Sequence, residues 1–161
     1  MDDVAERPSP AWRMAEAETA DDDPLLACLV ALTRLLGRPA SASVLVAGLP
    51  LPDGLLTPGL FARAAARAGL AARGLRRRLA DIDPLALPCI LLLEGRQACV
   101  LTRIGAESCT VLLADTGLGT VELPRHELAA RYLGMALFAR PEASVAALEP
   151  GAAAEAGGHW F

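Results

Sequence analysis

The chain has 161 residues, of which 53% are hydrophobic and 21% charged, and its formal net charge is −4. Residues 1–23 hold eight acids against two arginines, so the rest of the chain is close to neutral. Only six residues are aromatic, and no basic stripe with interleaved aromatic residues occurs, which argues against nucleic acid as a partner.

The two ends of the chain differ in composition from its middle. Residues 1–21 are acidic and lack an apolar period, so they are predicted to be a disordered tail. Residues 22–140 have the apolar content of a single folded domain, and residues 141–161 are predicted to be a flexible linker. No secretion signal is recognised, and no run reaches the roughly 18 apolar residues of a membrane helix, so the isolated domain is expected to be soluble.

Helical signals dominate the first half of the domain. Asp23 is a good N-cap and Pro24 suits the first helical position, while Leu25, Leu29 and Leu32 recur at helical spacing. Gly37 is expected to end this helix. Two further helices are predicted at residues 41–47 and 57–69, the latter with the cap and proline pair Thr57-Pro58 and a stop at Gly69.

From residue 70 the apolar period becomes that of strands. Short β-leaning runs occupy residues 70–77, 89–95, 97–105, 108–115 and 135–141. A short helix is predicted at residues 125–132, with Leu128 and Tyr132 on its inner side. The "GLGT" stretch at 117–120 is interpreted as a turn, because it lacks the lysine and helix of a phosphate-binding loop. Helices followed by an antiparallel sheet predict an α+β fold.

The reactive side chains form no obvious catalytic set. Cys28 lies five residues inside the first predicted helix, past the amides that would lower its pKa, so it is interpreted as a buried apolar residue. A nucleophilic thiol would need a base, and the two histidines of the chain are His126 and His159. His126 is on a predicted helix and His159 lies beyond the predicted linker, so a Cys–His pair is not expected. Cys89, Cys99 and Cys109 lack the paired spacing of zinc ligands, so no metal site is expected.

Arginines are concentrated in one part of the chain. The run "RGLRRR" spans residues 73–78 and follows two arginines of the third predicted helix. These residues are either a basic docking patch or a solvated face. They are Arg63, Arg67, Arg73, Arg76, Arg77 and Arg78.

Three stretches resemble a known family. They are "ACLVALTRLLG", "LPCILLLEGRQACVL" and "ADTGLGTVELPRHELAARYLGMALF". Their order and spacing are similar to those of the double-glycine leader peptidases, the family 39 cysteine peptidase domains at the N-termini of bacterial ABC exporters. The resemblance covers most of residues 22–140 and implies a papain-like fold.

The resemblance also assigns positions in a peptidase site. It implies that the nucleophile position is Pro24, the histidine position Gln97 and the orienting aspartate Asp115. The glutamine of the oxyanion hole would fall near Glu18, and Cys28 would occupy a second, structural cysteine position. Proline has no nucleophile and glutamine is no base near pH 7. A degenerate domain that is not a peptidase is therefore expected.

Similar degenerate domains occur in type I secretion exporters, where they handle unfolded, glycine-rich toxins and adhesins without cleaving them. The resemblance thus implies an unfolded secreted substrate as partner, together with the transmembrane and ATPase parts of the exporter. ATP and magnesium would belong to that ATPase part, and no cofactor is expected in this chain. The implied location is the cytoplasmic face of the bacterial inner membrane, in a homodimeric exporter whose isolated domain is monomeric.

Several alternatives stay open from the sequence. The closing "HWF" at 159–161 resembles the start of the juxtamembrane segment of such exporters. The six arginines and Gln97 are the candidate substrate-binding residues. Two interpretations compete with substrate binding. One is an active peptidase that uses Cys28, and the other is an architectural domain for exporter assembly.

Overall fold

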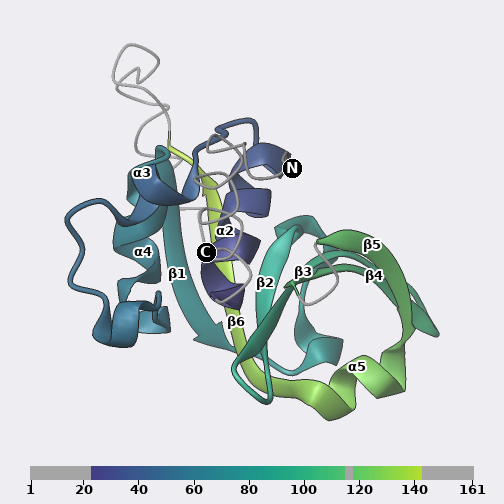
Figure 1. Cartoon of the computed structure of the whole chain (residues 1–161). Helices are drawn as coiled ribbons and strands as arrows, with labels where there is room; N and C mark the ends of the chain where they lie inside the picture. The colour runs from purple at the N-terminus through teal and green to yellow at the C-terminus, as the bar shows by residue number, and fades with distance from the viewer. Residues whose placement is uncertain (1–22, 115–117, 143–161) are drawn as a thin grey trace, which may run out of the picture.

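The computed structural model describes residues 23–114 and 118–142. The expectations for residues 1–21, Glu18, Asp115 and residues 143–161 lie outside this part. In chain order its main elements are α2 (Pro24–Leu35), α3 (Ala42–Val46), α4 (Pro58–Ala66), β1 (Leu70–Arg76), β2 (Cys89–Leu93), β3 (Gln97–Ile104), β4 (Ser108–Leu113), β5 (Gly119–Pro124), α5 (Arg125–Arg131) and β6 (Tyr132–Pro141). Helices precede a sheet, which confirms the predicted α+β fold (Figure 1).

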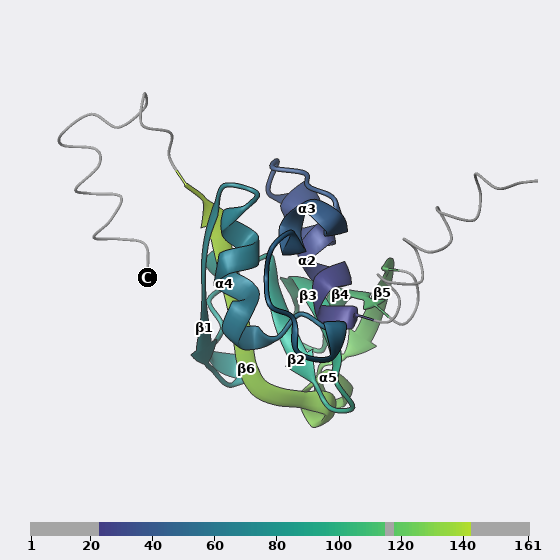
Figure 2. The same cartoon turned by 60° about the vertical axis from the view of Figure 1, so that its left-hand side comes forward.

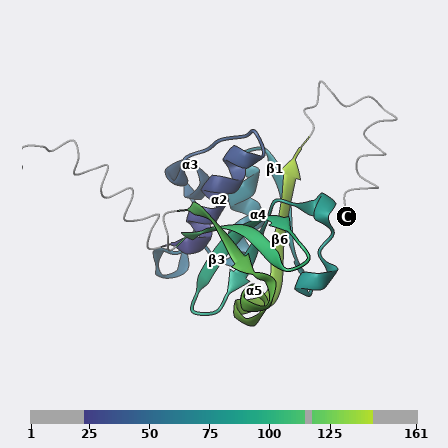
Figure 3. The same ribbon diagram turned by 90° about the vertical axis from the view of Figure 1, so that its right-hand side faces the viewer.

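The six strands form one antiparallel sheet in the order β1-β6-β2-β3-β4-β5. The last strand in sequence, β6, is inserted between β1 and β2, which leaves β1 and β5 at the two edges. Helices α2, α3 and α4 lie close together, as Figure 2 shows. Helix α5 lies at the opposite end of the molecule from α3 (Figure 3).

The sheet has a hydrophobic core on each face. Ala98 and Val100 of β3 pack in one cluster with the residues of α2, whereas Cys99 and Leu101 pack in a second cluster with Leu128 of α5. Successive residues of a strand point to opposite faces, so a strand covered on both faces is apolar throughout. This arrangement explains the continuous apolar runs of β2 and β3.

Helix α2 begins where the sequence predicts. The backbone N–H of Leu26 donates to the Asp23 carboxylate at 3.2 Å, and Pro24 occupies the first turn. Leu29 and Leu32 are fully buried. After the C-cap the chain reaches Gly37, whose φ of +78° is the left-handed conformation that glycine adopts without strain.

Strand β5 corrects the sequence interpretation. The "GLGT" stretch was predicted as a turn alone, but Gly119 and Thr120 already pair with β4. The strand lies at the sheet edge with most of its residues exposed or half-buried, so it lacks the apolar run that identified the other strands. Val121 and Leu123 are its contribution to the core around α5.

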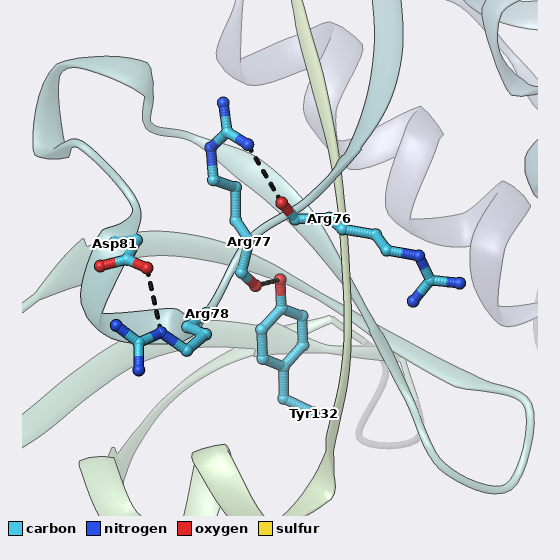
Figure 4. A network of polar contacts seen from close by, with 5 residues as sticks. All are labelled: Arg76, Arg77, Arg78, Asp81 and Tyr132. Atoms are coloured by element: carbon cyan, nitrogen blue, oxygen red, sulfur yellow. Dashed lines mark hydrogen bonds and ion pairs between the residues drawn. The ribbon is translucent and has the colours of Figure 1, made fainter.

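Two helix ends also differ from the predictions. Tyr132 belongs to β6 rather than to the inner side of α5, and its hydroxyl donates to the Arg77 carbonyl at 2.6 Å (Figure 4). Helix α4 ends at Ala66, and a turn carries the chain to Gly69. Thr57 stands at the N-cap of α4, but its side chain makes no capping hydrogen bond within the described residues.

Candidate functional site

A cleft of about 700 Å³ lies between the start of α2 and the β2–β3 hairpin. Its third wall is the segment that leads into α4, and Leu133 of β6 also lines it. Most of the residues that line it are apolar, and they include Leu25, Leu55, Leu56, Leu92 and Leu93. The described charged residues that line it are Asp23, Asp53 and Arg96.

Asp23 holds two walls of this cleft together. One carboxylate oxygen accepts the N–H of Leu26 at 3.2 Å, which caps α2, and the other accepts the N–H of Leu56 at 2.8 Å. Leu56 lies 33 residues further along the chain, in the wall that precedes α4. Asp23 is only 2% exposed, and this burial raises the pKa of its carboxyl although both amides act in the opposite direction.

The fold brings Pro24 and Gln97 to the same cleft. These are the two positions that the sequence resemblance assigned to a nucleophile and a histidine. Pro24 is half-buried at the first position of α2, and its ring offers neither a nucleophile nor an N–H donor. Gln97 is the first residue of β3, and its amide has no titratable proton near neutral pH.

The pleat of the hairpin distinguishes Gln97 from its neighbour. Gln97 pairs with Leu93 of β2, and Leu93 belongs to the core around α5. Ala98 instead packs in the core formed with α2, as does its cross-strand partner Leu92. The β3 residue at the cleft that faces α2 is therefore Ala98, which carries no polar side chain at all.

Cys28 lies one turn further along α2 and is fully buried, which confirms its interpretation as a core residue. Burial raises the pKa of its thiol well above the ordinary value, and the nearby Cys99 and Asp23 act in the same direction. Burial likewise raises the pKa of Cys89 and of Cys99 to about 12. Since the thiolate is the reactive form, these thiols are protected from reaction at neutral pH.

The remaining reactive groups lie away from the cleft. His126 is on α5 and lines a separate groove with Arg78 and Arg125. His159 lies outside the described residues. In the part of the chain that the structure describes, no three His, Cys, Asp or Glu side chains form a group that could hold a metal ion. No described helix has the length and apolar character to cross a membrane.

The six arginines singled out in the sequence are exposed and lie elsewhere. Arg63 is on α4 and Arg67 is its C-cap, whereas Arg73 and Arg76 are on the edge strand β1. None of the six lines the cleft.

The arginines that end the run make local contacts. Arg77 donates through Nη1 to the carbonyl of Arg76 at 3.0 Å, and Arg78 forms an ion pair with Asp81 at 3.1 Å (Figure 4).

The arginine that does line the cleft is Arg96, which sequence analysis missed. It lies in the tight turn between two strongly apolar strands. That position is the signal in the sequence that could have singled it out, because such a turn carries its side chain to the end of the sheet.

Comparison with known families and structures gives a consistent result. A model described as the Peptidase C39 family matches residues 14–144. The N-terminal peptidase C39-like domain of the toxin secretion ATP-binding protein from Vibrio parahaemolyticus is 39% identical, with a TM-score of 0.72 over 74% of this chain and 98% of that one. No curated protein matches.

Two more distant structures share the fold. The peptidase domain of Streptococcus ComA, a bifunctional ABC transporter of a quorum-sensing pathway, is 17% identical with a TM-score of 0.66, over 74% of this chain and 92% of that one. A double-glycine motif protease from an AMS/PCAT transporter, in complex with its leader peptide, is 20% identical with a TM-score of 0.59, over 74% and 84%.

Proposed function

Because the chain belongs to the peptidase C39 family, we propose that it is a peptidase-like domain of a bacterial ABC exporter that binds an unfolded polypeptide without cleaving it. The observation that carries this proposal is the cleft itself. It has room for a peptide and an apolar lining, yet the described residues that line it include no cysteine, serine, histidine or lysine.

The absence of a reactive pair among these residues argues against peptide hydrolysis. A cysteine peptidase needs a thiol and a base within hydrogen-bond reach. Pro24 stands at the start of α2, where the resemblance places the thiol, and both Gln97 and Ala98 lack a basic group. The described lining of the cleft therefore supplies neither the thiol nor the imidazole of a cysteine peptidase.

The partners follow from the same proposal. The Vibrio parahaemolyticus domain is part of a toxin secretion ATP-binding protein, so an unfolded secreted toxin or adhesin is the proposed substrate. The domain would act at the cytoplasmic face of the inner membrane, beside the transmembrane and ATPase parts of a homodimeric exporter. Holding a segment of substrate there raises its local concentration at the translocation entrance.

We expect the domain to leave a double-glycine leader peptide intact at every pH tested. The measurement is mass spectrometry of the peptide after long incubation, with an active family peptidase as positive control. Cleavage that is lost in the variant Cys28→Ala would contradict the proposal and favour the alternative that Cys28 is a nucleophile.

Cys28→Ala has a second expected effect. Loss of a small, fully buried side chain is expected to lower the free energy of unfolding by about 1–2 kcal/mol while peptide binding at equal folded fraction stays unchanged.

Deletion of the whole domain distinguishes substrate binding from a purely architectural role in exporter assembly. Loss of secretion in an exporter that still assembles normally would speak against the architectural role.

The exposed arginines are proposed to attract acidic substrate at long range. The triple variant of Arg76, Arg77 and Arg78 to alanine is expected to bind an unfolded acidic repeat polypeptide more weakly at low salt. Exposed charges are screened over about 10 Å at 0.1 M salt, so the difference should vanish as salt rises. Titration at both salt concentrations checks this, and equal affinity of the triple variant at low salt would reject the arginine patch.

A further inference from the structure

Two charged residues at the cleft adopt a backbone conformation that favours glycine. Arg96 has a φ of +61° in the turn of the β2–β3 hairpin, and Asp53 has a φ of +54° in the turn before α4. Both line the cleft, from different walls. The third described non-glycine residue with positive φ, Leu118, does not line it.

This conformation costs a side-chain-bearing residue about 1–2 kcal/mol relative to the right-handed region. Glycine would avoid the cost, and each turn already has a glycine beside the charged residue, Gly54 and Gly95. Strained positions occur preferentially at functional sites. Aspartate before glycine is common in such turns, so the turn itself accounts for Asp53. An arginine is not, so Arg96, where glycine would fit better, needs a reason outside its turn.

Neither side chain is engaged within the described part of the chain. Arg96 and Asp53 are exposed, and no hydrogen bond or ion pair joins either to another described residue. The other charged residue of the cleft, Asp23, already accepts two backbone amides. Arg96 is thus the cation of the described cleft, which the apolar side chains of Leu92 and Leu133 also line.

We propose that Arg96 selects the ligand of this cleft, and that the ligand is an extended apolar peptide segment that carries a carboxylate side chain. The inference rests on the proposed function and specifies its substrate class. The carboxylate accepts charge-assisted hydrogen bonds from the Arg96 guanidinium. Asp53 on the other wall disfavours a second carboxylate there.

The test uses two labelled synthetic peptides of glycine, alanine and leucine that differ only in one central aspartate or asparagine. Arg96→Gly removes the cation and places the preferred residue in the turn, so its melting midpoint should equal or exceed that of the parent. Asp53→Gly is the matched control, because it relieves the same conformation in the same cleft but removes a negative charge. Arg103→Ala removes one exposed cation of β3 outside the cleft.

The parent should bind the aspartate peptide about two- to fivefold more tightly than the asparagine peptide, the range of an exposed ion pair. This preference should disappear in Arg96→Gly, increase in Asp53→Gly and persist in Arg103→Ala. Persistence of the preference in Arg96→Gly, or equal binding of both peptides by the parent, would overturn the inference but leave peptide binding intact. Binding of neither peptide by the parent would overturn the proposed function and this inference together.

Discussion

Asp23→Ala is expected to lower the free energy of unfolding by about 3 kcal/mol. The substitution removes the N-cap of α2, which contributes about 1 kcal/mol, and leaves the N–H of Leu56 without its partner, where a buried unsatisfied donor costs about 1–3 kcal/mol. It also removes the hydrogen bond that joins the segment before α4 to the start of α2, so peptide affinity should fall as well. Urea unfolding and peptide titration measure the two effects.

Two variants separate the bonds of Asp23. Asp23→Ser keeps a hydroxyl that can cap α2 but is too short to reach Leu56 as well, so it should recover about 1 kcal/mol of stability and little of the peptide affinity. Ser41→Ala removes the N-cap of α3, where the Ser41 hydroxyl accepts the N–H of Val44, and serves as the control for capping alone. If Asp23→Ala lowers the free energy of unfolding no more than Ser41→Ala does, Asp23 has no role in joining the two walls.

The pH dependence of stability gives an independent measure at the same residue. Burial raises the pKa of Asp23 above its usual 3.8, so the folded state holds this proton more tightly than the unfolded chain does. The part of the stability that depends on this proton is therefore fully present below pH 3.8 and is lost as pH rises through the folded pKa, whereas the two hydrogen bonds from Leu26 and Leu56 remain. Asp23→Asn cannot titrate, so the advantage of the parent over this variant should shrink from pH 4 upward; an advantage that grows would show the opposite pKa shift.

Sequence patterns predicted those helices and strands that are determined by residues close together in the chain. The cap and proline before α2 and the apolar runs of β2 and β3 are local signals, and each became the predicted element. Strand β5 gave no comparable signal, because an edge strand covered on one face needs only alternate apolar residues. Its pairing with β4 is what makes it a strand.

The site was less predictable because it depends on contacts between distant segments. The bond from Leu56 to Asp23 joins residues 33 positions apart, and no local pattern indicates it. The face on which Gln97 lies depends on the register of the hairpin, since a shift of one residue moves every side chain to the other face. Arg96 lies in a turn, and its place at the cleft depends on the segment before α4, which forms another wall of the same cleft.

Pro24→Cys is expected to convert an unreactive protein into one that a thiol reagent labels rapidly at a single site. The four native cysteines are buried, and a pKa of about 12 at Cys89 and Cys99 leaves a thiolate fraction about a thousandfold below that of an ordinary cysteine. Position 24 is half-buried and lines the cleft. Alkylation of the introduced thiol at neutral pH should therefore be much faster than alkylation of Cys89 and Cys99, measured by mass spectrometry, with labelling in denaturant as control.

The same variant shows which β3 residue faces the start of α2. A histidine that reaches the introduced thiol lowers its pKa and shifts the pH profile of alkylation to lower pH. Since Ala98 packs toward α2 and Gln97 shares the face of Leu93, Ala98→His should produce this shift in the Pro24→Cys background and Gln97→His should not. A shift with Gln97→His alone would contradict the assignment from the pleat and return the histidine position to Gln97.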